Sequence, residues 1–186
     1  MGRPSNRVQR RAEIVQAFAS VLAEQGYAGA TMVVVAARAG VSPGLLHHHF
    51  RDKRDMLDAL LEQLARGFVA RAAGGDLESW VDGALGLEPG DVVAARCWVG
   101  VMGEALREPS LLQRLQQLVG VEVRALQHRG QLGQDDAVAL MAMTVGYLVV
   151  GAFRPDLTRG QAARQASRLS RLLSERPSEP RNPARA

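Results

Sequence analysis

The chain contains very little lysine, cysteine and aromatic side chain for its length. Among 186 residues, Lys53 is the single lysine, Cys97 is the single cysteine, and only eight residues are aromatic. No glycine precedes Lys53 in Phe50-Arg51-Asp52-Lys53, which excludes a P-loop, and a Schiff-base enzyme would have to use this one lysine. An unpaired cysteine excludes an intrachain disulfide and suits a reducing compartment. The scarcity of aromatics beside abundant Ala and Leu favours helices over a β-sandwich or barrel.

The formal charge of +4 is unevenly spread along the chain. Residues 1–54 hold eight basic and three acidic residues, whereas the remainder holds 15 basic and 16 acidic residues. A basic segment next to a near-neutral one indicates that the first part meets a polyanion and that the second part has another task. The excess of arginine over the single lysine is equally explained by the base composition of the genome, so the choice of basic residue does not by itself indicate a partner.

The sequence has no feature that requires a membrane. The first residues are polar and basic and lack the apolar run of an export signal, so we expect a cytoplasmic protein. One uncharged run, residues 137–153, reaches the lower length limit of a membrane span. Because this run contains Thr144, Gly146 and Gly151, we interpret it as a buried helix and expect no membrane partner.

The spacing of apolar residues predicts an all-α chain of about nine helices. In the first part, Thr31 and Ser42 are predicted N-caps, and Gly26 and Gly40 end the helices that precede them. The helices are expected at residues 8–25, 31–39, 43–50, 53–73, 77–86, 91–107, 110–129, 135–153 and 156–174. Residues 175–186 hold three prolines and no apolar anchor, which predicts a disordered tail.

Residues 31–50 have the pattern of a helix-turn-helix, in which a glycine-containing turn precedes a short second helix with a polar face. With the lead-in Tyr27-Ala28-Gly29-Ala30-Thr31 and the following Arg51-Asp52-Lys53-Arg54-Asp55-Met56-Leu57, this stretch resembles the DNA-binding end of the TetR family of transcriptional regulators. The resemblance implies a three-helix DNA-binding domain at residues 8–54 and a helical ligand-binding and dimerisation domain at residues 55–174.

The same resemblance places the DNA contacts around the turn and the second helix. A helix enters a major groove about 12 Å wide when its exposed face is small, polar or basic. The hydroxyls of Thr31 and Ser42, the first-turn amides beside them and the ammonium of Lys53 are expected on phosphates, and Leu45 is expected on a thymine methyl. Leu46 and Phe50 are expected in the core. The predicted DNA-binding residues are Thr31, Ser42, Pro43, Gly44, Leu45, His47, His48 and Lys53.

Two positions depart from the family pattern. Val33 and Val34 replace a pair that is commonly polar or charged, which either exposes apolar surface or packs it differently. His47 stands where the family usually has a tyrosine against the DNA backbone. A histidine there serves either as a pH-dependent contact or as a neutral hydrogen-bonding ring.

Neither an enzyme nor a metal site is expected. Gly40-Val41-Ser42-Pro43-Gly44 matches a hydrolase nucleophile elbow, but Pro43 lacks the N–H that the residue after the nucleophile must donate to the oxyanion hole. The three histidines at positions 47–49 are successive, and successive helical side chains point about 100° apart, so they do not converge on one ion. We therefore predict no catalytic residue, no cofactor and no metal.

The second part resembles regulators related to the betaine-synthesis repressor, in Ala94-Ala95-Arg96-Cys97-Trp98-Val99-Gly100 and in residues 108–117. This resemblance implies a small-molecule cavity between helices, although ordinary core packing is the alternative for each residue. The predicted ligand-binding residues are Phe68, Trp98, Met102, Met141, Met143 and Tyr147. Val145-Gly146-Tyr147 replaces the subgroup's frequent Asp-Gly-Leu, so a cationic ligand such as choline is not expected. Burial beside Trp98 predicts a raised pKa and low reactivity for the Cys97 thiol.

Small residues in the last two predicted helices allow close helix packing, which in this family forms a four-helix dimer interface. The predicted interface residues are Ala142, Gly146, Ala162, Ala166, Leu169 and Leu173, with packing inside one chain as the alternative. The expected function is a homodimeric regulator, most often a repressor, that binds a pseudo-palindromic double-stranded DNA operator and is released by a small molecule. Two alternatives remain: a regulator without an effector, and a small-molecule-binding protein without an operator.

Overall fold

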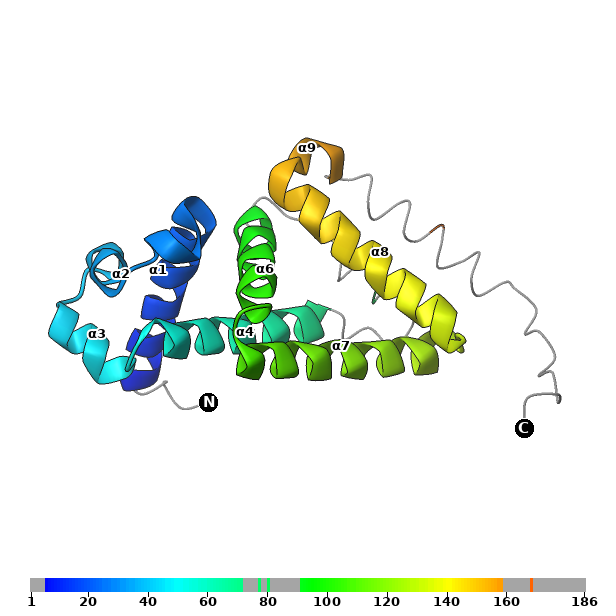
Figure 1. The fold of residues 1–186 in the computed structure, drawn as a ribbon, viewed down its shortest axis with the longest axis horizontal. Coiled ribbons are helices and arrows are strands. Elements are labelled where there is room, and N and C mark those ends of the chain that lie inside the picture. Colours follow the sequence, from blue (N-terminus) through cyan, green and yellow to red (C-terminus); the bar gives the residue numbers. More distant parts are fainter. Residues whose placement is uncertain (1–5, 72–76, 78–79, 81–90, 159–167, 169–186) are drawn as a thin grey trace.

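The computed structural model describes residues 6–71, 77, 80, 91–158 and 168, and the elements within these ranges are helices joined by turns (Figure 1). This confirms the predicted all-α class with an N-terminal helix-turn-helix. The predicted helix at 77–86 lies mostly outside the described residues, as do most of 156–174 and the whole of 175–186. The helices are α1 (Asn6–Gly29), α2 (Met32–Ala39), α3 (Pro43–His49), α4 (Lys53–Arg71), α6 (Asp91–Ala105), α7 (Pro109–Gly130), α8 (Gln134–Phe153) and α9 (Pro155–Thr158).

Local signals set the ends of the first three helices, as the sequence predicts. Gly26 interrupts α1 with a φ of 71°, in the left-handed region that favours glycine. Thr31 caps α2 by accepting a hydrogen bond from the Val34 N–H at 3.3 Å, and Gly40 ends α2 at a φ of 64°. Ser42 then caps α3 by accepting from the Leu45 N–H at 3.2 Å. The turn that aims α3 is therefore specified by residues within it.

An arginine fixes α2 against α1. Arg38 donates to both carboxylate oxygens of Glu24, at 2.9 and 2.7 Å, and to the Ser20 hydroxyl at 2.6 Å. Ser20 in turn donates to Glu24 at 3.1 Å. These hydrogen bonds, with Arg38 as the main cause, lower the pKa of Glu24 from 4.5 to about 2. The bidentate geometry holds α2 at a defined angle on α1.

A single apolar core joins the N-terminal helices to the rest of the chain. Its buried side chains come from α1, α2, α3, α4, α6 and α7, and Leu46 and Phe50 lie in it with no exposed surface, as predicted. Cys97 of α6 is buried in the same core and its thiol donates to the carbonyl of Ala19 in α1 at 3.3 Å. Burial raises the pKa of this thiol to about 12, which confirms the predicted direction. The domain boundary after residue 54 stays a prediction, and the two segments share this core.

Figure 1 places α3 at one end of the described part of the chain and the end of α7 with the start of α8 at the other. Helices α1 to α3 gather at one end, and α4 leads away from them toward the middle. Helix α6 packs on α1, while α7 and α8 pack on α6 and on each other. As a result, α4 and α6 connect the helix-turn-helix to the part of the chain formed by α7 and α8.

Helix α8 is long and apolar enough to cross a membrane, yet only 28% of its most apolar window is buried. The expectation of a buried helix is therefore correct for one face and wrong for the other. Ala137, Leu140 and Thr144 face the core. The outward face carries an exposed stripe at intervals of three or four residues, formed by Val138, Ala142, Gly146, Val150 and Phe153, which we call the α8 stripe.

The Glu24 hydrogen bonds predict a specific acid sensitivity. Because the folded state lowers the Glu24 pKa, its contribution to the free energy of unfolding is full above pH 4.5 and is lost as the pH falls toward 2. We expect Glu24→Gln to be less stable than wild type at pH 7 and the difference to shrink between pH 4.5 and 2. Urea unfolding followed by circular dichroism measures it. In an Arg38→Gln background the same substitution should have little effect, and a pH-independent difference would contradict the account.

Candidate nucleic-acid interface and ligand cavity

The outer face of α3 is open to solvent and nearly free of large apolar groups. Leu45 is 39% exposed, while Leu46 and Phe50 turn inward and anchor the helix. The caps leave the Thr31 and Ser42 hydroxyl protons available, since each oxygen accepts from a backbone N–H and a hydroxyl also donates. Seven of the predicted DNA-binding residues are exposed, namely Thr31, Ser42, Pro43, Gly44, Leu45, His47 and His48.

Val33 and Val34, the two residues of α2 that depart from the family pattern, differ in burial. Val33 is 67% exposed, and Val34 is half-buried and packs against the core. The replacement of the family's polar pair thus puts one branched apolar side chain on the surface of α2 and adds the other to the core.

Lys53, the eighth predicted residue, binds within the chain. Its ammonium donates to the carbonyl of Tyr27 at 2.7 Å and lies 3.9 Å from the centre of the Tyr27 ring. Tyr27 follows the Gly26 interruption near the end of α1, and Lys53 is the first residue of α4. The contact between them therefore joins the end of α1 to the start of α4. Any phosphate contact of Lys53 has to be shared with this carbonyl.

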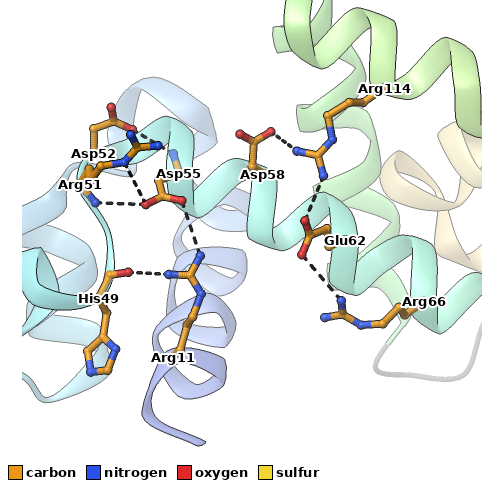
Figure 2. A network of polar contacts seen from close by, with 9 residues as sticks. All are labelled: Arg11, His49, Arg51, Asp52, Asp55, Asp58, Glu62, Arg66 and Arg114. Atoms are coloured by element: carbon orange, nitrogen blue, oxygen red, sulfur yellow. Dashed lines mark hydrogen bonds and ion pairs between the residues drawn. The ribbon is translucent and has the colours of Figure 1, made fainter. Parts of the chain in front are cut away.

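Arginine and aspartate residues tie α3 to α1 and α4, as Figure 2 shows. Arg11 donates to the carbonyl of His49 at the end of α3 and pairs with Asp55 of α4 at 3.5 Å. The Arg11 guanidinium also lies 3.9 Å from the centre of the Phe50 ring. Asp55 accepts from the Arg51 N–H at 3.2 Å. The position of α3 is thus fixed by side chains from two other helices, which sequence reasoning did not identify.

The same face of α4 reaches α7. Asp58 and Glu62 pair with one guanidinium, that of Arg114 in α7, at 2.6 and 3.2 Å (Figure 2). Asp55, Asp58 and Glu62 follow at three- and four-residue intervals, so they share one side of the helix. We call these three residues the α4 carboxylates. Through Asp55 the start of α4 contacts α1, whose Arg11 also binds the end of α3. Through Asp58 and Glu62 the following turns of α4 contact α7.

A cavity of about 70 Å³ lies between α6, α7 and α8. Of the predicted ligand-binding residues, Trp98, Met102 and Met141 line it. Met143 and Tyr147 do not line it; with Met141, they pack against the buried cluster that contains Trp80. The Phe68 side chain lies outside the described residues. The remaining lining residues, which sequence reasoning missed, are Leu115, Leu118, Val119, Glu122, Thr144, Val145 and Leu148.

Glu122 is the one charged residue among those that line the cavity. It is only 6% exposed, and its Oε2 accepts a hydrogen bond from the Trp80 indole N–H at 3.2 Å. In the sequence, the one feature that points to burial of Glu122 is its position between Val121 and Val123 in an amphipathic helix. The partner lies 42 positions earlier in the chain, so the pattern by itself does not separate a buried carboxylate from a solvated one.

The predicted dimer residues fall into two groups. Ala142 and Gly146 are exposed and belong to the α8 stripe. Ala162, Ala166, Leu169 and Leu173 lie outside the described residues.

The chain is similar in sequence to known bacterial regulators. Residues 14–60 match the family model for bacterial regulatory proteins of the tetR family. The chain is 31% identical over 120 residues to the HTH-type transcriptional regulator BetI of Escherichia coli, a match that covers 59% of this chain and 61% of that protein. It is 27% identical over 175 residues to BetI of Serratia proteamaculans, with 87% of each chain covered.

Solved structures of regulators share the fold. A transcriptional regulator from Rhodococcus sp. Rha1 superposes with a TM-score of 0.78 at 23% identity, over 88% of this chain and 95% of that one. A putative TetR-family transcriptional regulator from Rhodococcus sp. superposes with a TM-score of 0.74 at 25% identity, over 90% and 99% of the two chains. Residues 14–60, which include the exposed α3, thus match the tetR family of bacterial regulatory proteins, and the chain is similar to the regulator BetI in sequence and to solved transcriptional regulators in fold.

Proposed function

We propose that the protein is a homodimeric repressor that binds a pseudo-palindromic operator and is released when a small molecule enters the cavity between α6, α7 and α8. The observation that carries the proposal is the combination of an exposed α3 with a cavity that α4 and α7 connect to it. The proposed compartment is the cytoplasm, where an operator is accessible.

The exposed residues of α3 support a docking geometry in the major groove. Pro43, Gly44 and Leu45 form its first turn, and their small or apolar side chains suit close approach to base edges, with Leu45 on a thymine methyl. His47 and His48 lie one turn further, within reach of bases or phosphates. Arg51 follows, and its side chain is 89% exposed, so we add it to the proposed phosphate contacts.

The α8 stripe supports dimerisation. Phe153 is 69% exposed, and the stripe holds two further valines between small residues at which helices approach closely. Exposed apolar residues aligned along one helix mark an interaction surface. Pairing of α8 with its copy in a second chain covers the stripe and brings two copies of α3 into one complex. In a dimer of helix-turn-helix proteins the half-sites lie one helical turn, about 34 to 36 Å, apart.

The cavity supports the proposal of a small-molecule effector, and its small size supports a mechanism in which the ligand displaces helices. At about 70 Å³ it is well below the roughly 300 to 1,000 Å³ of an ordinary ligand pocket. A ligand of more than a few atoms therefore has to move α6, α7 and α8 apart. A displacement of α7 acts on α4 through the Arg114 guanidinium, and α4 acts on α3 through Asp55 and Arg11.

The energy needed for release is modest. A ligand that favours one arrangement of the helices by about 1 to 3 kcal/mol changes operator affinity by roughly 5- to 150-fold. Each exposed ion pair contributes about 0 to 1 kcal/mol to stability, so the α4 carboxylates serve mainly to set geometry.

Two other functions remain open. A regulator without an effector would bind its operator with an affinity that no metabolite changes. A small-molecule-binding protein without operator function would retain the cavity and would not protect DNA from nuclease cleavage. A footprint on the upstream region of its own gene and a thermal-shift screen of metabolites separate these cases.

Lys53 tests the proposed phosphate contacts. If its ammonium reaches a phosphate, Lys53→Ala weakens binding to all DNA sequences and lowers the slope of log affinity against log salt by about one. Fluorescence anisotropy at several salt concentrations measures both. Arg66→Ala is the matched control, since Arg66 lies on the same helix and pairs with Glu62 far from α3. An unchanged slope in Lys53→Ala would assign the ammonium to the Tyr27 contact alone.

Selection of bound sequences from random DNA tests the function as a whole. We expect enrichment of a pseudo-palindrome whose half-sites are centred about one helical turn apart. The complex should contain two copies of the chain by analytical ultracentrifugation. No enriched motif, or a motif without two-fold symmetry, would contradict the proposal.

A further inference from the structure

We infer that the cavity between α6, α7 and α8 takes an uncharged hydrocarbon: a molecule about the size of one ring or a short alkyl chain, held by apolar contact alone and without a hydrogen bond. The inference rests on the proposed ligand-responsive function and names the chemical class of the effector.

The described residues that line the cavity present only apolar surface to it. Trp98 supplies an aromatic ring, and Met102 and Met141 supply thioethers. The aliphatic part of the wall comes from α7 and α8, with Leu115, Leu118, Val119, Val145 and Leu148. A molecule in the cavity therefore meets carbon and sulfur atoms on the sides that these residues form.

The two polar side chains among the lining residues direct their polar groups elsewhere. Thr144 is 3% exposed, and its hydroxyl donates to the carbonyl of Leu140 in the same helix at 2.9 Å. Glu122 is 6% exposed, and its Oε2 accepts from the Trp80 indole N–H at 3.2 Å. Since the surface of the cavity is apolar, both residues contribute carbon atoms to it.

A wall of this kind selects against polar ligands. A hydroxyl placed in it loses its hydrogen bonds to water and gains none from the described residues, and an ammonium or carboxylate loses far more. A hydrocarbon loses nothing on entry and buries apolar surface. The inference agrees with the expectation, drawn from Val145-Gly146-Tyr147, that a cationic ligand does not bind here.

The volume sets the size of the ligand. The cavity holds about 70 Å³, roughly half of the about 150 Å³ of an engineered apolar cavity that binds benzene. Methionine side chains adapt to the shape of what they contact, and Met102 and Met141 form part of the wall. A single ring therefore requires only a small separation of α6, α7 and α8, which is the motion that the proposed release needs. Val119 lines the cavity and is 39% exposed, so a ligand reaches the cavity from the surface of α7.

The methionines of the chain make the site observable. Of the six, Met102 and Met141 line the cavity, whereas Met32 and Met56 lie in α2 and α4. We would titrate the full-length protein, with isotopically labelled methionine methyl groups, at pH 7 and follow the methyl signals by NMR. The probes are toluene, phenol, benzylamine and benzoate. Toluene should shift the signals of Met102 and Met141 more than those of Met32 and Met56, and the shifts should saturate.

The four probes separate a hydrocarbon from polar molecules that carry the same ring. Toluene and phenol have nearly the same size, so their difference in affinity measures the cost of burying a hydroxyl. Phenol should bind at least about tenfold more weakly than toluene, and the charged benzylamine and benzoate should bind more weakly than phenol.

Two substitutions test that the polar groups face away from the cavity. Glu122→Gln and Thr144→Val keep the size of each side chain and change its polar group. The affinity for toluene should stay within about threefold of wild type in both variants, and its preference over phenol should persist. Loss of toluene binding in either folded variant would assign the polar group to the site and contradict the inference.

Two further substitutions fill the cavity from opposite walls. Val145→Phe in α8 and Val119→Phe in α7 should each weaken toluene binding at least about tenfold. Val121→Phe is the matched control, because Val121 lies on α7, is 51% exposed and is not among the lining residues. Thermal unfolding checks that each variant is folded, and the wild-type titrations decide the chemical class if a variant is not.

The outcome separates this inference from the proposed function. Phenol or benzylamine binding as tightly as toluene, or the absence of a saturable shift at Met102 and Met141, would overturn the hydrocarbon assignment. Operator binding, and its release by a polar metabolite, would still stand in that case. Failure to bind any operator would overturn the proposed function and leave the toluene titration unaffected.

Discussion

The α4 carboxylates are the constraint on which the two ends of this protein depend. Asp55 meets Arg11, which also holds the last carbonyl of α3, and Asp58 and Glu62 meet Arg114 of α7. A helix transmits displacement as a rigid body, so one rotation of α4 changes both sets of contacts together. The shared core adds to this coupling, because α1 packs on α6 and α6 lines the cavity. The proposed DNA-binding surface on α3 is thereby linked to the cavity by packed helices and ion pairs.

The charged groups differ between the two ends of the protein. In the N-terminal helices the charged groups are exposed or half-buried and hold fixed geometry through bidentate or shared contacts, as with Arg38 on Glu24 and Arg11 on Asp55. In the cavity wall a single carboxylate, Glu122, lies among apolar side chains with one neutral donor. Burial of this carboxylate is costly, and the hydrogen bond from the Trp80 indole N–H offsets part of that cost.

The sequence predicts those features of the fold that depend on residues close together in the chain, such as helix caps and the apolar faces of helices. The caps Thr31 and Ser42 and the end of α2 at Gly40 are local features that the structure confirms, and each cap accepts from an amide three residues away. Gly26 interrupts α1, which continues to Gly29. The apolar spacing likewise predicts Leu46 and Phe50 as core. Contacts between distant segments escape such reasoning: Arg114 lies 56 positions from Asp58, and Glu122 lies 42 from Trp80. The expectation that α8 is buried is wrong for its outward face, since composition does not tell which face of a helix packs on the core.

The central claim, that α3 and the cavity are coupled through α4, is tested without a known effector. Coupling is reciprocal, so operator binding has to change the cavity as much as a cavity ligand changes operator binding. Trp98 lines the cavity and Trp80 donates to Glu122, a residue of the cavity wall, and the emission of both tryptophans and its quenching by acrylamide can be followed while a selected operator is added. The account predicts a saturable change with the affinity that anisotropy gives for the operator, and a smaller change in Arg114→Met. Full operator binding with unaltered tryptophan emission and quenching would contradict it.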